Sequence, residues 1–134
     1  MGKSRQPTGI VYDDLFETHC NLYDEAHQET PKRYSAVMER CRELGLLDRC
    51  LRVSSVDASD EQILTNHSQE LLDLMSETSG VTDLKKLQEM SDRFDSVYFH
   101  PDTKSVVRRA AGCAIKLVQE ILAGVVHNGM AIVR

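Results

Sequence analysis

The most regular pattern of apolar and polar positions in the chain runs from Thr103 to Ala123. Apolar residues recur there at helical spacing, which predicts an amphipathic helix with one face toward a core. Gly124 follows directly and is expected to end the helix. The residues of the apolar stripe are Val107, Ala110, Ala111, Ala114, Leu117, Val118, Ile121 and Leu122.

Short runs of β-branched and apolar residues predict strands. The runs cover Thr8 to Tyr12, Cys50 to Val53 and Met130 to Val133, and the second is the weakest because Arg52 interrupts it. Asn128-Gly129 is a turn dipeptide and is expected to connect the long helix to the last strand. Strands that alternate with helices are typical of an α/β fold with a parallel sheet.

A second helix is expected between Thr30 and Gly45. Thr30 is a suitable N-cap, and Pro31 fits the first helical position, where its missing N–H is not needed. Gly45 is expected to end the helix. The predicted inward face consists of Tyr34, Val37, Met38, Cys41 and Leu44.

Shorter helical segments are expected before the long helix. Ser59 and Gln62 have the spacing of a capping box, in which each side chain accepts a hydrogen bond from the backbone of the other residue. Two further segments have apolar residues at helical spacing. The first begins after Ser68, has Leu71, Leu72 and Met75 on its inward face and ends at Ser79-Gly80. The second begins after Thr82 and has Leu84, Leu87 and Met90 on its inward face.

The remaining segments lack a clear period. Residues 1–7 are polar and are expected to be a disordered tail, which leaves residues 8–134 as one domain. Residues 15–29 are expected to form a long loop, a kind of segment that is often functional. Residues 94–101 are expected to be extended, because a residue that precedes proline disfavours the α-helical region.

Composition and charge narrow the function classes. The chain has 134 residues, 16 basic and 21 acidic side chains and a formal net charge of −5, which argues against direct binding of nucleic acid. No run approaches the roughly 20 apolar residues that a membrane-spanning helix needs. The four cysteines form no CxxC pair, so neither a disulfide framework nor a structural zinc site is indicated. We interpret Cys41 and Cys113 as core residues on helix faces.

The residues alone provide no catalytic set. His19, Cys20 and His27 lie in the predicted loop without the partner spacing of a zinc site, and we interpret His19 and Cys20 as surface loop residues. The sequence contains no nucleophile elbow, glycine-rich phosphate cradle or HExxH motif. Structural roles are expected for other candidates: packing or capping for His67, and turn formation for Asp13, Asp14 and Asp95.

Several stretches, taken in order, resemble one known family. They are TGIVYD at 8–13, ETPKR at 29–33, GLLDRC at 45–50, FDSVYFHP at 94–101 and NGMAIVR at 128–134. The series is similar to the zinc-dependent histone deacetylases of class IIb, with the first catalytic domain of the tubulin deacetylase as the nearest match. The resemblance implies a three-layer arginase/deacetylase-type α/β fold with a parallel sheet, of which this chain would be an N-terminal portion truncated before the catalytic half.

The resemblance implies that the complete domain hydrolyses acetyl-lysine on histone or tubulin-type protein substrates, with a zinc ion that activates water. In the family, the strand that ends in Ile-Val-Arg precedes the catalytic histidines, and the zinc ligands follow later. This chain is therefore expected to hold no metal and no catalytic residue, and to be inactive alone. Two alternatives stay open: a non-catalytic protein-interaction module, and a fragment of a polyamine deacetylase. The family implies a cytoplasmic location, with the nucleus as a second one.

The resemblance also assigns roles to individual residues. Ser96 matches the class IIb serine that accepts a hydrogen bond from the substrate backbone amide, and His27 matches a first-loop residue near the rim of the substrate channel. The family commonly has proline after this histidine, whereas Gln28 stands here. Arg33 matches an arginine that lies beneath the active site in relatives. The alternatives are a turn residue for Ser96 and a helix-surface charge for Arg33.

Overall fold

The computed structural model describes residues 6–134, so residues 1–5 of the expected tail lie outside the described residues. Three parallel strands, β1 (Thr8–Val11), β2 (Leu51–Arg52) and β3 (Asn128–Ala131), form a sheet in the order β2-β1-β3. The sheet confirms the α/β class with parallel strands that the sequence predicted.

The helices account for most of the remaining regular structure. A 3-10 helix, η1, interrupts the segment that was expected to be a continuous loop, because Asp13 accepts a hydrogen bond from the backbone N–H of Leu15 and caps it. The helices are η1 (Asp14–Glu17), α1 (Lys32–Glu43), α2 (Leu46–Arg49), α3 (Asp60–Leu64), α4 (Gln69–Thr78), α5 (Leu84–Ser91) and α6 (Thr103–Leu122). No helix among residues 6–134 is long and apolar enough to cross a membrane.

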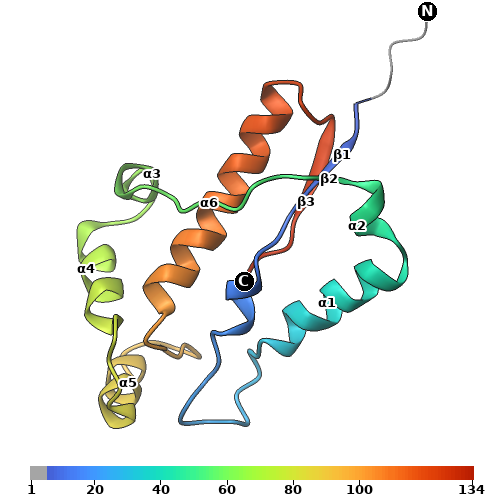
Figure 1. Cartoon of the computed structure of the whole chain (residues 1–134). Helices are drawn as coiled ribbons and strands as arrows, with labels where there is room; N and C mark the ends of the chain where they lie inside the picture. Colours follow the sequence, from blue (N-terminus) through green and yellow to red (C-terminus); the bar gives the residue numbers. More distant parts are fainter. Residues whose placement is uncertain (1–5) are drawn as a thin grey trace, which may run out of the picture.

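The sheet lies between two helices. Figure 1 shows α6 on one side of the strands and α1 on the other, with α3, α4 and α5 beyond α6. The side chains buried between these layers form one apolar cluster, which is the main core. It consists of Ile10, Val11, Phe16, Tyr34, Met38, Cys41, Val53, Val106, Cys113, Leu117, Val126 and Ile132.

The predicted helix starts are confirmed where a side chain caps the backbone. Both hydrogen bonds of the Ser59–Gln62 capping box are present, and Ser68 caps α4. The helix expected from Thr30 begins slightly later, with Pro31 in the N-cap position, although the Thr30 hydroxyl still accepts a bond from the N–H of Lys32 at 3.3 Å. Capping geometry therefore sets these helix boundaries.

The expected turn at Asn128-Gly129 is wrong, because both residues belong to β3. Asn128 pairs with Thr8, and Gly129 pairs with Gly9. A Cβ atom at Gly129 would lie 2.5 Å from Leu117 Cδ1 and 2.9 Å from the carbonyl oxygen of Gly9. The glycine is thus required by the close approach of α6 to the sheet, and the strand begins earlier than its apolar run suggested.

The apolar stripe predicted on α6 has the correct helical period, but some of its residues do not face the sheet. Val106, Cys113 and Leu117 are buried against the sheet, whereas Val118 is 54% and Leu122 81% exposed. Val107 lies on a different flank, toward α3 and α4. The helix is therefore apolar on two flanks, and a single stripe drawn from spacing alone merges them. Val37 and Leu44 of the expected α1 face are likewise exposed.

Candidate functional site

Arg134 lies at the carboxyl edge of the sheet, immediately after the strand β3 and its extension. In parallel α/β sheets, ligand sites are built at this edge. The Arg134 side chain is only 2% exposed, and its Nε atom donates to Glu29 at 2.8 Å. Its terminal nitrogens donate to the carbonyl oxygens of Phe16 at 3.0 Å and His19 at 2.5 Å, and to the Tyr98 hydroxyl at 2.7 Å. One guanidinium thus joins the sheet edge to two loops.

Tyr98 is the centre of contact between those loops. Its hydroxyl donates to the carbonyl oxygen of His19 at 3.1 Å while it accepts from Arg134. Its ring stacks on His19, with centroids 5.0 Å apart and planes at 25°, and meets His27 edge-on at the same centroid distance. Burial raises the pKa of Tyr98, and the charge of Arg134 opposes that effect. Tyr98 therefore remains a neutral phenol with both hydrogen-bonding roles filled.

His19 is a loop residue, as expected, but it is only partly exposed and is fixed by tertiary contacts. Its Nε2 atom lies 2.8 Å from the hydroxyl of Thr103, the first residue of α6. Burial, followed by the positive charges of Arg134 and His100, lowers the pKa of His19 to about 4. The ring is therefore neutral near pH 7 and anchors its loop to the start of α6. Cys20, beside it, is also partly buried.

His27 lines a cavity of about 480 Å³ along the first loop. Its Nδ1 atom accepts a hydrogen bond from the backbone N–H of Glu29 at 3.1 Å. Burial alone would raise the pKa of Glu29, but hydrogen bonds from Arg33 and Arg134 outweigh it and hold that pKa below its usual value. The cavity wall is formed by Cys20, Asn21, Leu22, Asp24, Glu25, His27, Glu29, Thr30, Pro31 and Lys32.

Ser96 is exposed and lies in a bend within the segment that was expected to be extended. Its φ of 54° is in the left-handed region, which is costly for a residue with a side chain. Ser96 does not line the cavity that contains His27, although Tyr98, two positions later, touches His27. The substrate-binding roles of Ser96 and His27 stay predictions.

Arg33 lies on the surface of α1 among the described residues. Its side chain is 58% exposed and pairs with Glu29 through two hydrogen bonds of 3.3 and 3.2 Å. A position beneath an active site stays a prediction for this residue. Glu29 thus joins two arginines, one exposed and one buried.

The described residues do not fit a catalytic zinc ion. Residues 6–134 contain no group of three or more His, Cys, Asp or Glu side chains placed to hold a metal. His100 precedes α6 and His127 follows it, and the formed helix of 20 residues separates their ends by roughly 30 Å. No step of metal chemistry can therefore be assigned to side chains in this part of the chain.

Sequence reasoning did not identify Arg134 and Tyr98 as structural centres of this edge. The available signal was position: an arginine directly after a buried parallel strand must place its charge at the loop-bearing edge. A buried guanidinium requires several acceptors, and carbonyl oxygens of an irregular loop can supply them. The particular acceptors depend on tertiary contacts that the sequence pattern does not contain.

Comparison with known proteins places this geometry in a family. The family model of the histone deacetylase domain matches residues 27–134. The chain is 41% identical over 129 residues to the polyamine deacetylase HDAC10 of Homo sapiens, covering 95% of this chain and 19% of that protein. It is 30% identical over 131 residues to histone deacetylase 6 of Caenorhabditis elegans, covering 95% of this chain and 14% of that protein.

A solved structure agrees with the sequence comparisons. The crystal structure of the HDA15 HD domain superposes with a TM-score of 0.83 at 25% identity, covering 95% of this chain and 36% of that chain. The chain therefore spans about a third of a solved deacetylase domain. These findings confirm the class IIb resemblance and the arginase/deacetylase-type fold. The chain belongs to the histone deacetylase family.

Proposed function

We propose that this chain forms the first part of a lysine deacetylase domain and supplies one wall of its substrate channel. The observation that carries the proposal is Arg134, which holds the loop of His27 and the loop of Ser96 together at the carboxyl edge of the sheet. Family membership supports amide hydrolysis as the reaction of the complete domain. The role of this chain is then to bind and orient the acylated substrate.

The proposal assigns no bond-breaking step to the described residues. Amide hydrolysis of this type needs a polarised carbonyl and a positioned base near the attacking water. The part of the chain that the structure describes has no group of side chains placed for a metal. We expect the chain alone to bind no catalytic zinc and to show no turnover of an acetyl-lysine peptide.

The preferred substrate is an acetylated protein lysine, as on histone or tubulin, which would place the protein in the cytoplasm or the nucleus. A second candidate is an acetylated polyamine. The 41% identity to a protein named polyamine deacetylase favours this candidate. Two carboxylates, Asp24 and Glu25, line the His27 cavity and would attract either the amines of a polyamine or a basic peptide, whereas Glu29 is already paired with Arg33 and Arg134.

A chimera tests the proposal. This chain would replace the 129 matching residues of human HDAC10, and the product would be assayed with acetyl-lysine peptides and with an acetylated polyamine. Turnover of peptides supports the preferred substrate, and turnover of the polyamine alone supports the second candidate. A folded chimera that loads zinc but acts on neither substrate would contradict the wall role. The isolated chain with zinc, assayed in parallel, should be inactive.

A further inference from the structure

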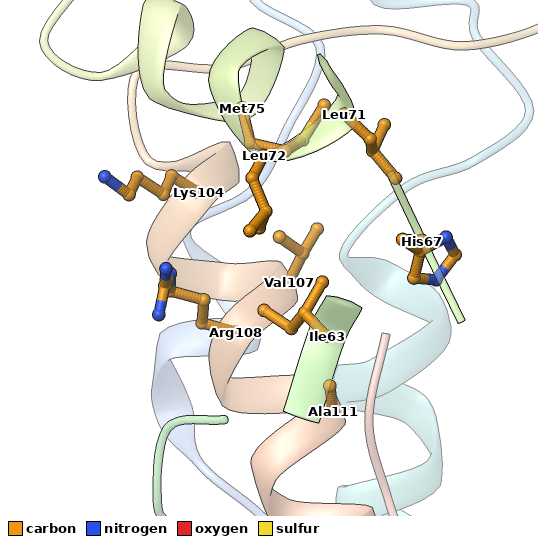
Figure 2. Close-up of a pocket in the computed structure, with 9 residues that line it drawn as sticks. All are labelled: Ile63, His67, Leu71, Leu72, Met75, Lys104, Val107, Arg108 and Ala111. Atoms are coloured by element: carbon orange, nitrogen blue, oxygen red, sulfur yellow. The ribbon is translucent and has the colours of Figure 1, made fainter. Parts of the chain in front are cut away.

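An apolar pocket lies away from the carboxyl edge, between the helices α3, α4 and α6. Its volume is about 300 Å³, at the lower end of the range for small-molecule sites. Figure 2 shows the side chains of α4 above it and those of α6 and α3 below. Six aliphatic or thioether side chains form most of its wall: Ile63, Leu71, Leu72, Met75, Val107 and Ala111.

The polar groups of the pocket are confined to its margin. Lys104 and Arg108 occupy one flank in Figure 2, and His67 occupies the opposite flank. Lys104 and Arg108 are separated by four positions on α6, so they lie one above the other on the same helix face. The margin therefore presents two cationic side chains beside an aliphatic interior.

The two cations differ in how far they are already neutralised. Arg108 donates from one terminal nitrogen to the carbonyl oxygen of Ala58 at 3.0 Å and forms an ion pair with Asp60. Its Nε atom is buried and has no hydrogen-bond partner among the described residues. Within the same part of the chain, no hydrogen bond or ion pair engages the amine of Lys104. One free ammonium thus borders the pocket, whereas the unfilled N–H of Arg108 is enclosed by protein atoms.

The start of α6 adds to the positive potential of this margin. Lys104 lies in the first turn, which contains no acidic residue. The side chain of Asp102, the N-cap residue, forms no capping hydrogen bond with that turn. A lysine there repels the positive end of the helix dipole, whereas an anion would be stabilised by both. This margin is therefore electrostatically suited to a negative group.

We propose that the pocket binds a free medium-chain aliphatic carboxylate. The hydrocarbon tail lies among the aliphatic side chains, and the carboxylate lies at the flank of Lys104, whose ammonium has no other partner among the described residues. A volume of about 300 Å³ holds roughly ten methylene groups, if each occupies about the 30 Å³ of a water molecule. None of the pocket residues belongs to the carboxyl-edge site, so the inference is independent of the proposed deacetylase role.

Titration calorimetry of the 134-residue chain with hexanoate, octanoate and decanoate tests the inference. Affinity should rise about fourfold for each added methylene until the pocket is full. An alkylamine of equal length should bind at least about tenfold more weakly, because it meets Lys104 with like charge. Equal binding of octanoate and octylamine, or no dependence on chain length, would overturn the proposal.

Two variants locate the binding site. Lys104→Gln should weaken octanoate binding about tenfold and leave the binding of octanol unchanged, since a charged hydrogen bond is lost. Lys86→Gln, on the exposed surface of α5, is the matched control and should change neither. Ala111→Phe should fill the pocket and abolish binding of both ligands. If the carboxylate binds Lys104→Gln or Ala111→Phe as tightly as the parent chain, the assignment to this pocket is wrong.

The other occupant of the pocket that an experiment can detect is a second copy of this chain. A second copy of the chain would cover the pocket and compete with the carboxylate. Sedimentation velocity at several protein concentrations would then show a dimer that Ala111→Phe disrupts and octanoate does not need. That result would contradict the proposal, whereas a monomer that binds octanoate supports it.

Discussion

The interior between α6 and the sheet and the carboxyl edge of the same sheet are stabilised in different ways. Side chains such as Val11, Cys113 and Val126 are fully buried in the interior and contribute apolar contacts. At the edge, the buried group is Arg134, which is satisfied by a carboxylate, two carbonyl oxygens and a phenol. The interior therefore depends on many weak contacts and the edge on a few directional ones.

The difference has consequences for stability and for substrate binding. Loss of one apolar contact leaves the other contacts in place, so an interior tolerates changes that keep its volume. Loss of Arg134 would remove the bonds to both loops at once and take the donor from the carbonyl oxygen of Phe16, while that of His19 would keep only its bond from Tyr98. Loops that depend on so few bonds can open without unfolding the sheet. This suits a surface that must admit a substrate.

The largest expected effect concerns the tightest packing of the interior. Gly112 of α6 lies against the segment that follows β2, and a Cβ atom there would be 2.1 Å from the carbonyl oxygen of Val56. Because backbone cannot yield as a flexible side chain does, Gly112→Ala should lower the free energy of unfolding by at least about 3 kcal/mol. Urea denaturation measures the change, with Gln119→Ala on the exposed face of α6 as control. A loss below about 1 kcal/mol would contradict this view of the interior.

A smaller but more local effect is expected at the edge. Arg134→Met removes every bond from the guanidinium to Glu29, the loop carbonyls and Tyr98. We expect a loss of about 2–3 kcal/mol in unfolding free energy. Hydrogen exchange should accelerate in residues 19–31 and 94–101 while β1 keeps its protection. Uniform acceleration across the chain would show that the edge and the interior form one cooperative unit.

Arg33→Met is the matched control for Arg134→Met. Both guanidinium groups bond Glu29, but that of Arg33 is exposed and bonds no other residue described in the structure. Exposed ion pairs contribute about 0–1 kcal/mol, so this variant should leave exchange at the edge almost unchanged. Equal effects of the two substitutions on hydrogen exchange would show that the order of the edge loops depends on Glu29 alone.

The sequence predicted the interior better than the edge, for a physical reason. Periodicity reports which residues face a core, and it identified α6, α4 and the parallel class from positions such as Leu72 and Leu117. Capping also depends on neighbours in sequence, which explains the correct interpretation of Ser59 with Gln62. These signals are local. They failed at Gly129, where a helix distant in sequence, and not a turn, requires the glycine.

The edge was visible from the sequence only through resemblance. His27 and Ser96 were selected because they match family positions, whereas Arg134, Tyr98 and His19 were not assigned roles there. Their bonds join residues that are 36 to 118 positions apart along the chain. No local pattern specifies such pairs, since each partner is an ordinary loop residue until the loops meet.

The next expected effect is a pH dependence of the unfolding free energy that comes from the carboxyl edge. The folded pKa of His19 is about 4, below the value of 6.5 for a free histidine, so the unfolded chain binds more protons between these values. Stability should therefore be highest above pH 6.5 and fall as the pH approaches 4. The full shift corresponds to about 3 kcal/mol, and solvent screening of the partly exposed ring reduces the expected loss to about 2 kcal/mol. His100, whose pKa burial also lowers, contributes in the same direction. Denaturant unfolding across this range measures the slope.

His19→Gln should flatten much of that slope, because glutamine can bond Thr103 and does not titrate. His67→Gln, at an exposed position outside the edge, is the control and should leave the slope unchanged. The carboxylates of Asp13 and Glu29, whose pKa values are lowered from 3.8 and 4.5, act in the same direction once the unfolded carboxylates begin to bind protons, so the two variants are compared above about pH 5.5. An unchanged slope in His19→Gln would show that its burial does not determine the pH response.

The smallest effect tests whether Ser96 is a substrate-binding residue or only a turn residue. Its left-handed backbone favours glycine, so Ser96→Gly should raise the unfolding free energy by about 0.5–1 kcal/mol, whereas Ser96→Ala should not. Both variants lack the hydroxyl. In the chimera with human HDAC10, both should therefore weaken peptide turnover by about 0.5–1.5 kcal/mol, the net contribution of one hydrogen bond. If Ser96→Gly gains stability and both variants keep full turnover, Ser96 is a turn residue and the rim hydrogen bond must come from another group.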